Sequence, residues 1–217
     1  MDVLYLGHSS FRLTNRKVSV VCDPFDPVVV GLKFPKVSAT IVTISHDHKD
    51  HNNFAAVNDV KKVINGPGEY EIEGVSVIGI SSFHDAKKGQ ERGQNTMYVI
   101  EMDGVRIAHL GDLGHVISES IVNQIGDIDV LMIPVGGEYT IGANEAAEVA
   151  RLIEPNVIVP MHYQMPGLNS ESFSKLQPVE PFISALGIKV ESAPKLSIKA
   201  DSYTNGDQII WRAPLFK

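Results

Sequence analysis

Histidine and aspartate are concentrated in one short stretch of the sequence. Residues 45–51 read SHDHKDH, which places three histidines and two aspartates in seven positions, although the chain of 217 residues holds only 8 histidines. Zinc and similar divalent ions bind imidazole nitrogens and carboxylate oxygens, and without a cation these groups would repel one another or stay unsatisfied. The spacing therefore predicts four metal ligands in this stretch: His46, His48, Asp50 and His51. Asp47 and Lys49 alternate with them and should point to solvent.

Further candidate ligands follow hydrophobic runs that read as strands. Asp112 and His162 each come after such a run, where an ionic group without compensation would be expensive, so ligation is the economical interpretation. His84 has the same setting and would supply a further nitrogen. Asp23 allows two interpretations: a turn former before Pro24, or an acceptor that orients a ligating imidazole through its other nitrogen. Because loops at one edge of a sheet can converge, the pattern predicts one site rather than several.

The elements that must position these residues are mainly strands. Hydrophobic, β-branched runs predict nine of them, at residues 3–6, 18–22, 39–45, 61–64, 75–80, 97–102, 105–110, 129–135 and 156–161. Asp103-Gly104 predicts a hairpin between two of these strands, so the sheet should be mixed. Helices that would cover sheet faces are predicted between strands, at residues 53–60, 115–125, 144–155 and 178–187. Two further strands should flank TNGD at 204–207, and residues 1–217 read as a single domain with a pseudo-symmetric division near Asp103-Gly104.

Composition and charge narrow the class of protein. The formal charge is −7 and no run of Lys or Arg exceeds two residues, so the sequence disfavours nucleic acid as a partner and leaves room for a small, anionic substrate drawn to a metal. Cys22 is the only cysteine, which rules out an internal disulfide and a cysteine-rich zinc site. No apolar run approaches the length of a membrane span, and the start, MDVLYLGHSSFRL, lacks a leader pattern. The expected location is therefore the cytoplasm, while self-association into a homo-oligomer stays open.

The candidate ligands together have the order and spacing of a known family. They resemble the full motif series of hydrolases with the metallo-β-lactamase fold, in this order: Asp23, His46-x-His48-x-Asp50-His51, His84, Asp112 and His162. The flanks YLGHSSFRL, HLGDLGH and PVGGEYTIGANEAAEVARLIEPNVIVPMHY are similar to the stand-alone branch that includes L-ascorbate-6-phosphate lactonase. The similarity runs from residue 3 to about 163, and no ligand position is substituted.

The resemblance implies a fold and two metal ions. The fold would be α/β (α+β), a four-layer αββα sandwich of two mixed sheets with the metals at one edge. The implied ligands are, for one ion, His46, His48 and His84, for the other, Asp50, His51 and His162, with Asp112 as the bridge. Two divalent ions about 3.5–4 Å apart can share a hydroxide, direct it at carbon or phosphorus and stabilise the developing oxyanion. Zn²⁺ suits these nitrogen-rich ligands, and Mn²⁺ or Fe stays open for the carboxylate-rich half.

Two more histidines join Asp50 and Asp112 as catalytic candidates. His8 in LGHSS and His115 in GDLGH each lie close to a predicted strand end, and the family pattern repeats both. Either could bind a substrate oxygen or protonate a leaving group. Simple packing in a loop is the alternative for each.

Two segments are candidates for the walls of the site. Tyr139 and Thr140 follow a glycine pair and would line its mouth, although such a turn by itself indicates only close backbone approach. Residues 85–94, DAKKGQERGQ, follow His84 and read either as a flap over the site or as an idle surface loop.

The leading hypothesis is a binuclear metal-dependent hydrolase that cleaves a small ester, lactone or phosphodiester. A nuclease acting on RNA or nucleotides is one alternative, but processing nucleases of this fold usually bring an inserted domain or recognition arm that the chain lacks. An iron-binding redox protein like the flavodiiron oxygen reductases is another; those commonly have a carboxylate where this chain has His48, and they carry a flavodoxin domain. A metal-binding scaffold without catalysis is the third.

Overall fold

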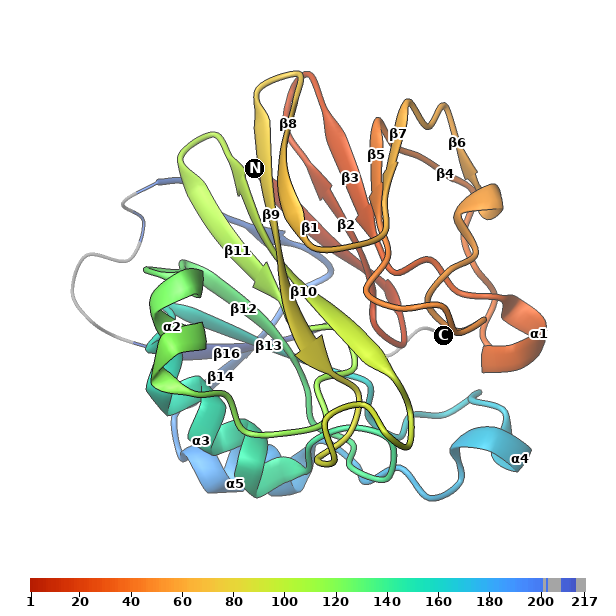
Figure 1. The fold of residues 1–217 in the computed structure, drawn as a ribbon, viewed down its shortest axis with the longest axis vertical. Helices are drawn as coiled ribbons and strands as arrows, with labels where there is room; N and C mark the ends of the chain where they lie inside the picture. The colour runs from red at the N-terminus through yellow and green to blue at the C-terminus, as the bar shows by residue number, and fades with distance from the viewer. Residues whose placement is uncertain (201, 203–207, 214–217) are drawn as a thin grey trace.

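Two mixed β-sheets face each other and carry almost all the strands (Figure 1). The computed structural model describes residues 1–200, 202 and 208–213. In spatial order, the first sheet contains β15 (Leu196–Ser197), β1 (Asp2–Gly7), β2 (Ser10–Thr14), β3 (Ser19–Cys22), β5 (Ile41–Thr43) and β7 (Lys62–Ile64). The second contains β14 (Lys189–Ser192), β16 (Ile209–Arg212), β13 (Val157–Met161), β12 (Val130–Pro134), β11 (Val105–His109), β10 (Gln94–Met102), β9 (Val75–Phe83) and β8 (Gly68–Ile72). A small ribbon pairs β4 (Val37–Ser38) with β6 (Val57–Asn58).

Helices cover the outer face of the second sheet. α2 (Glu119–Ile125), α3 (Ala143–Ile153) and α5 (Glu180–Leu186) lie together on that face (Figure 1). α3 buries Ala146, Val149, Ala150 and Ile153, whose spacing of three and four residues places them on one side of the helix. The first sheet has only short elements beside it: α1 (Pro27–Val30), the 3₁₀ turn Phe54–Ala56 and α4 (Ser170–Phe173). No helix of the described residues has the length and apolarity needed to cross a membrane.

The strands that lead to the candidate ligands all run in one direction within their sheet. β1 and β3 are both antiparallel to β2, and β5 is parallel to β3. In the second sheet, β9 and β11 are both antiparallel to β10, and β12 and β13 continue parallel to β11. The residues that follow these strands therefore emerge at one edge of each sheet, as a convergent site requires.

The two sheets share one hydrophobic core. Phe11 and Ile41 of the first sheet belong to the same buried cluster as Ile100 and Ile107 of the second, and burying a side chain of this size contributes roughly 1.5–3 kcal/mol. Polar links also join the two sheets: the hydroxyl of Tyr98 donates to the carbonyl oxygen of Ile44 at 2.8 Å, just before the histidine cluster, and Nε2 of His109 lies 2.9 Å from the carbonyl oxygen of Ser9.

The sequence predicted most of the strands and the mixed sheets, and both are confirmed. The hairpin at Asp103-Gly104 is present, with β10 and β11 antiparallel. A division at that hairpin is wrong, because the chain passes from the first sheet to the second between β7 and β8, at residues 65–67. The helix predicted at 53–60 is only a 3₁₀ turn, because Val57 and Asn58 pair with β4 instead. The TNGD segment lies outside the described residues, but the strands on either side of it, β15 and β16, form in different sheets.

Replacing Tyr98 with phenylalanine should lower the free energy of unfolding by about 1–2 kcal/mol, because the buried carbonyl of Ile44 loses its donor. Urea denaturation at fixed metal content would measure the change. Tyr70→Phe is the matched control, since the Tyr70 hydroxyl reaches only the nearby carbonyls of residues 66 and 67. Equal effects of the two substitutions would contradict a special role for the link between the sheets.

Candidate metal centre

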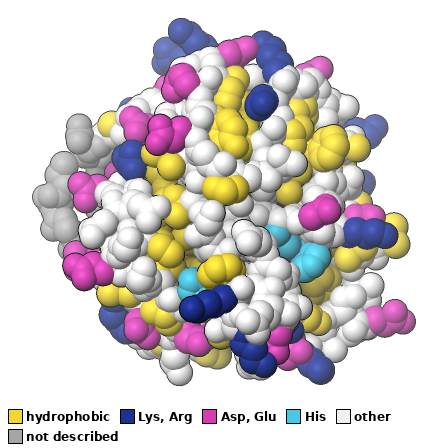
Figure 2. All heavy atoms as spheres, viewed as in Figure 1, with side chains coloured by type: hydrophobic (Ala, Val, Ile, Leu, Met, Phe, Trp, Pro, Cys, Tyr) yellow, Lys and Arg dark blue, Asp and Glu magenta, His cyan; other side chains and the backbone are white. Residues whose placement is uncertain are grey.

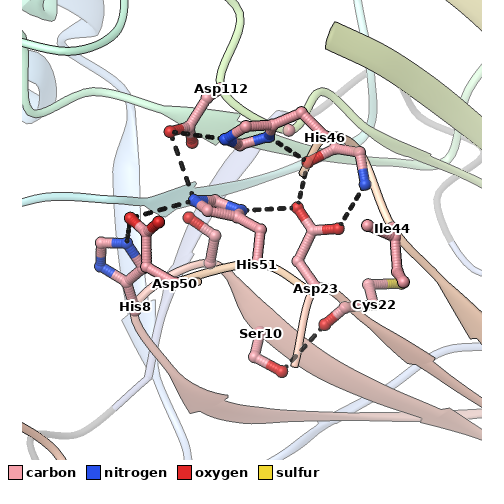
Figure 3. A network of polar contacts seen from close by, with 12 residues as sticks. His8, Ser10, Cys22, Asp23, Ile44, His46, Asp50, His51 and Asp112 are labelled. Atoms are coloured by element: carbon pink, nitrogen blue, oxygen red, sulfur yellow. Dashed lines mark hydrogen bonds and ion pairs between the residues drawn. The ribbon is translucent and has the colours of Figure 1, made fainter. Parts of the chain in front are cut away.

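Four imidazole rings surround one carboxylate oxygen of Asp112. The Oδ2 atom of Asp112 lies 3.3 Å from the Nε2 atoms of His51, His84 and His162, and 3.8 Å from that of His46. His46 and His51 lie in the loop after β5, His84 and His162 directly follow β9 and β13, and Asp112 follows β11. Figure 3 shows Asp112 facing His46 and His51, with Asp50 and His8 beside them. On one face of the molecule, histidine side chains also reach the surface (Figure 2).

The potential ligand atoms form three overlapping groups. In each group they lie within 4.8 Å of one another: His46, His48 and His84; His46, His51 and Asp112; and His8, Asp50, His51 and His162. All seven residues predicted as ligands are therefore brought together, and they divide between two adjacent sides of Asp112. His48 is exposed to solvent, whereas His51 and His162 are fully buried.

The buried donor atoms fit a cation. Within the described part of the chain, no hydrogen-bond partner is present for the Nε2 atoms of His46, His51 and His162 or for Oδ1 of Asp112. Leaving such buried polar atoms unpaired is costly. Divalent ions bound by these nitrogens and carboxylates would satisfy all of them at once.

The charges of the site also call for positive ions. Burial alone would raise the pKa of Asp112, but His162 and His51 hold it well below its usual range. Burial lowers the pKa of His46 to about 3, helped by His51, so this ring is neutral and has a free lone pair at neutral pH. Burial would also lower the pKa of His51, yet Asp112 and Asp50 raise it well above the ordinary value. The carboxylates therefore attract a proton to His51 where a metal ion would otherwise provide the positive charge.

Asp23 orients two of the histidines from behind. Its Oδ2 atom accepts a hydrogen bond from Nδ1 of His51 at 2.8 Å and another from the hydroxyl of Ser45 at 2.5 Å. The Ser45 hydroxyl in turn lies 2.9 Å from Nδ1 of His46, which can donate to it. Both rings are thereby held with Nδ1 protonated and Nε2 free to bind a metal. The structure brings Asp23 to the position that the second of the two sequence interpretations requires.

Two residues of this support were not predicted from the sequence. Ser45 directly precedes the cluster, and only its place next to His46 could have indicated its role. Asn95 is buried in β10, where its side chain accepts from the backbone N–H of Asp112 at 3.0 Å and donates to the Leu110 carbonyl at 2.9 Å. A polar residue just inside a hydrophobic strand was the available signal.

The backbone is strained at three of the turns that carry the site. His8, Asp23 and His162 have φ angles of 54°, 43° and 51°, in the left-handed region. Each such residue costs about 1–2 kcal/mol relative to an ordinary conformation. The backbone N–H of His162 donates to the carbonyl of His8 at 3.1 Å, so two of these strained turns support each other.

A cavity of about 350 Å³ opens onto the centre. Its walls include the candidate ligands His48, Asp50, His84 and Asp112, together with Val29, Arg92, Tyr139, Ser172 and Phe173. Tyr139 therefore lies where the sequence placed it. This volume suits a small molecule rather than a polymer.

The other predicted residues lie away from this cavity. His8 is buried behind Asp50, with its Nε2 atom 3.2 Å from the Asp50 carboxylate. His115 uses both ring nitrogens on the backbone, accepting from the N–H of Phe83 at 3.3 Å and lying 2.9 Å from the Val116 carbonyl. The hydroxyl of Thr140 donates to the Ile141 carbonyl at 3.1 Å. Neither His115 nor Thr140 is among the described residues that line the cavity, and their functional roles stay predictions.

Comparison with known proteins agrees with this geometry. The family model for the β-lactamase superfamily domain matches residues 2–162. A UPF0173 metal-dependent hydrolase from Thermococcus onnurineus is 31% identical over 191 residues, covering 75% of this chain and 84% of that protein. The chain belongs to the UPF0173 family of metal-dependent hydrolases in the metallo-β-lactamase superfamily.

Solved structures of the superfamily have the same architecture. A candidate Zn-dependent hydrolase of the metallo-β-lactamase superfamily from Thermotoga maritima is 36% identical, with a TM-score of 0.77 over 98% of both chains. The metallo hydrolase Igni18 from Ignicoccus hospitalis, at 21% identity, shares the fold with a TM-score of 0.65 over 86% of this chain and 90% of that one. The expected fold is therefore present, whereas a place in the lactonase branch is not shown.

Asp23→Asn should weaken metal binding by about 10- to 100-fold while the chain stays folded. Asparagine has one acceptor oxygen where Asp23 has two, so its NH₂ group would face donor to donor either Nδ1 of His51 or the backbone N–H of Ser45, and either arrangement weakens the hold on the histidines. Competition with a chromophoric chelator would measure the affinity. Asp47→Asn is the control, because Asp47 is exposed in the same motif and its side chain contacts Asn52. Equal affinity in both variants would refute the role given to Asp23.

Proposed function

We propose that the chain is a binuclear, zinc-dependent hydrolase that cleaves a small ester, lactone or phosphodiester. The observation that carries this proposal is the division of the ligand atoms into groups on two sides of Asp112. Each side contains buried imidazole nitrogens that have no hydrogen-bond partner among the described residues. His46, His48 and His84 would hold one ion, and Asp50, His51 and His162 the other, with Asp112 between them. The description of the Thermotoga relative as Zn-dependent supports zinc as the metal.

Two bound divalent ions would supply an activated water and a Lewis acid for the developing oxyanion. The protein's own residues then divide the remaining work. Asp112, at the centre of the four rings, would serve as a ligand shared by both ions. Asp50 lines the cavity and is partly open to it, so its carboxylate can hold a proton passing to or from the substrate.

His8 would act through Asp50 rather than on the substrate. Its side chain is fully buried, and burial lowers its pKa to about 4, helped by His162. The described residues offer no hydrogen-bond partner for Nδ1 of His8. This agrees with a neutral ring that has no proton on Nδ1 and donates Nε2–H to Oδ2 of Asp50. This contact would hold one Asp50 oxygen in place and keep the carboxylate ionised. His8 is thus proposed as a positioning residue.

Metal content and turnover together test the proposal. Protein purified without added metal should contain close to two zinc ions per chain by elemental mass spectrometry. Asp112→Asn should reduce hydrolysis of model lactones, esters and phosphodiesters by at least about 1,000-fold, because it removes the shared ligand. Asp47→Asn should retain both metal and turnover, since this carboxylate of the same motif points to solvent.

Other outcomes would contradict the proposal. Iron together with oxygen consumption, and no hydrolysis, would favour the redox alternative. Two metal ions without turnover of any of the three substrate classes would favour a binding scaffold. Cleavage of RNA with no activity on small substrates would favour a nuclease, against which the charge of −7 argues.

His8→Gln and His8→Phe separate the positioning role from simple packing. Glutamine can still donate to Asp50, so it should retain most of the activity, whereas phenylalanine should lower kcat by about 10- to 100-fold with little change in KM. The pH dependence of kcat should also shift upward in His8→Phe, because Asp50 loses a donor that stabilises its ionised form. Equal kinetics in the two variants, at equal metal content, would show that His8 only fills space.

A further inference from the structure

Arg92 is the one arginine or lysine among the described residues that line the cavity of the metal centre. Its side chain is half-buried, and no carboxylate of the described residues forms an ion pair with its guanidinium group. The guanidinium carbon lies 5.5 Å from the centre of the Tyr139 ring. A cation held on an aromatic face in this way keeps its edge N–H donors free.

The carboxylate of Asp85 accepts several of the hydrogen bonds that hold the loop carrying Arg92. Asp85 accepts four backbone hydrogen bonds, from the N–H groups of residues 87, 89, 91 and 92, at 2.7–3.0 Å. The last of these is the N–H of Arg92 itself, at 2.8 Å. The segment predicted as a flap or an idle loop is thus wound around Asp85, and this arrangement fixes the point where the arginine leaves the backbone.

Stability gives no reason for an unpaired arginine at this place. A cavity that borders a proposed pair of divalent ions is already positively charged, and a further cation in its wall would weaken metal binding by repulsion. A surface arginine with that cost would be expected to pair with a carboxylate or to extend into solvent. Instead, its contact with Tyr139 keeps Arg92 in the cavity wall.

The rest of the wall is different in character. Val29, Tyr139 and Phe173 give it an apolar side, with the Tyr139 and Phe173 rings in edge-to-face contact at 6.2 Å. A ligand in this space therefore meets metal ligands, apolar side chains and one guanidinium group. These three features suit a small molecule with a reactive group for the ions, a short hydrocarbon part and a separate anionic group.

We propose that Arg92 binds an anionic group of the substrate, a carboxylate or a phosphate, that is separate from the bond being cleaved, and that Asp85 positions Arg92 for this task. Guanidinium groups bind both kinds of anion through paired N–H donors. This inference rests on the proposed hydrolase function, because it treats the bound molecule as a substrate. It names the substrate class: anionic esters, lactones or phosphodiesters rather than neutral ones.

Binding without turnover is the first test. The probes are straight-chain dicarboxylates from malonate to adipate, each compared with the monocarboxylate of equal length, on metal-loaded protein by isothermal titration calorimetry. In the wild-type protein, one dicarboxylate should bind more tightly than its monocarboxylate partner. Arg92→Gln should weaken the binding of that dicarboxylate by about 10- to 100-fold and leave the monocarboxylate unchanged. The matching phosphonocarboxylates show whether the site prefers phosphate or carboxylate.

Lys88→Gln is the matched control, because it removes one positive charge from the same loop at a residue that is exposed and does not line the cavity. It should leave all these affinities unchanged. Dicarboxylate binding that is unaffected by Arg92→Gln, or reduced equally by Lys88→Gln, would overturn the proposal. Because no reaction is involved, either result stands whether or not the hydrolase function is correct.

Turnover then tests the two proposals separately. With 4-nitrophenyl hemisuccinate and the neutral 4-nitrophenyl butyrate, Arg92→Gln should raise KM for the anionic ester about 10-fold or more and leave the neutral ester unchanged. Hydrolysis of both esters with no effect of Arg92→Gln would reject the anion site and retain the hydrolase. An Arg92-dependent gain in dicarboxylate binding with no hydrolysis of any ester, lactone or phosphodiester would retain the anion site and reject the hydrolase.

A double-mutant cycle tests the part assigned to Asp85. At saturating metal, Asp85→Asn should weaken dicarboxylate binding, and in combination with Arg92→Gln it should add little. If the double variant instead lost affinity for the dicarboxylate by the product of the two single effects, Asp85 would not act through Arg92.

Discussion

The crowding of imidazole rings around the carboxylate of Asp112 is the constraint on which the rest of the structure depends. Four Nε2 atoms lie within 3.8 Å of a single oxygen, and positive charge among these buried groups stabilises such an arrangement. It also requires that loops from two different sheets meet within a few ångströms. The uniform direction of β1, β3 and β5, and of β9, β11 and β13, provides this meeting point.

Close backbone packing keeps those loops together. A Cβ atom on Gly111, whose φ is 56°, would collide with the side chains of Ser45 and Asn95, and one on Gly114 would collide with the backbone of His84 and Asp85. The two glycines of HLGDLGH therefore let the loop that carries Asp112 lie directly against both the histidine loop and the loop that carries Arg92. The precision of the metal centre is a property of these contacts as well as of the ligands themselves.

The sequence singled out the residues that the structure brings together around Asp112, because the information that marks them is local. Each ligand type follows a hydrophobic run, and the spacing in SHDHKDH is too dense for other uses. β2 and β8 were missed although each pairs with a neighbouring strand in a hairpin, because each has only two apolar side chains in five residues. Features set by tertiary contacts rather than by a sequence pattern were missed as well: the loop after His84 takes its shape from the four N–H groups that meet on Asp85. The apolar wall was missed for the same reason, since Val29 and Phe173 are 144 residues apart in the sequence.

That wall is also where specificity can arise without disturbing the metals. α1 and α4 pack against each other, with the N–H of Asn169 donating to the Val30 carbonyl at 2.8 Å, and the backbone at 167–169 lies directly against Gly31. None of these contacts involves a metal ligand, so their side chains can change while the centre stays intact. The same holds for Arg92, which is fixed by Asp85 and Tyr139. A shared fold and a shared ligand set therefore define a type of chemistry, and the segments around the cavity decide which molecule undergoes it.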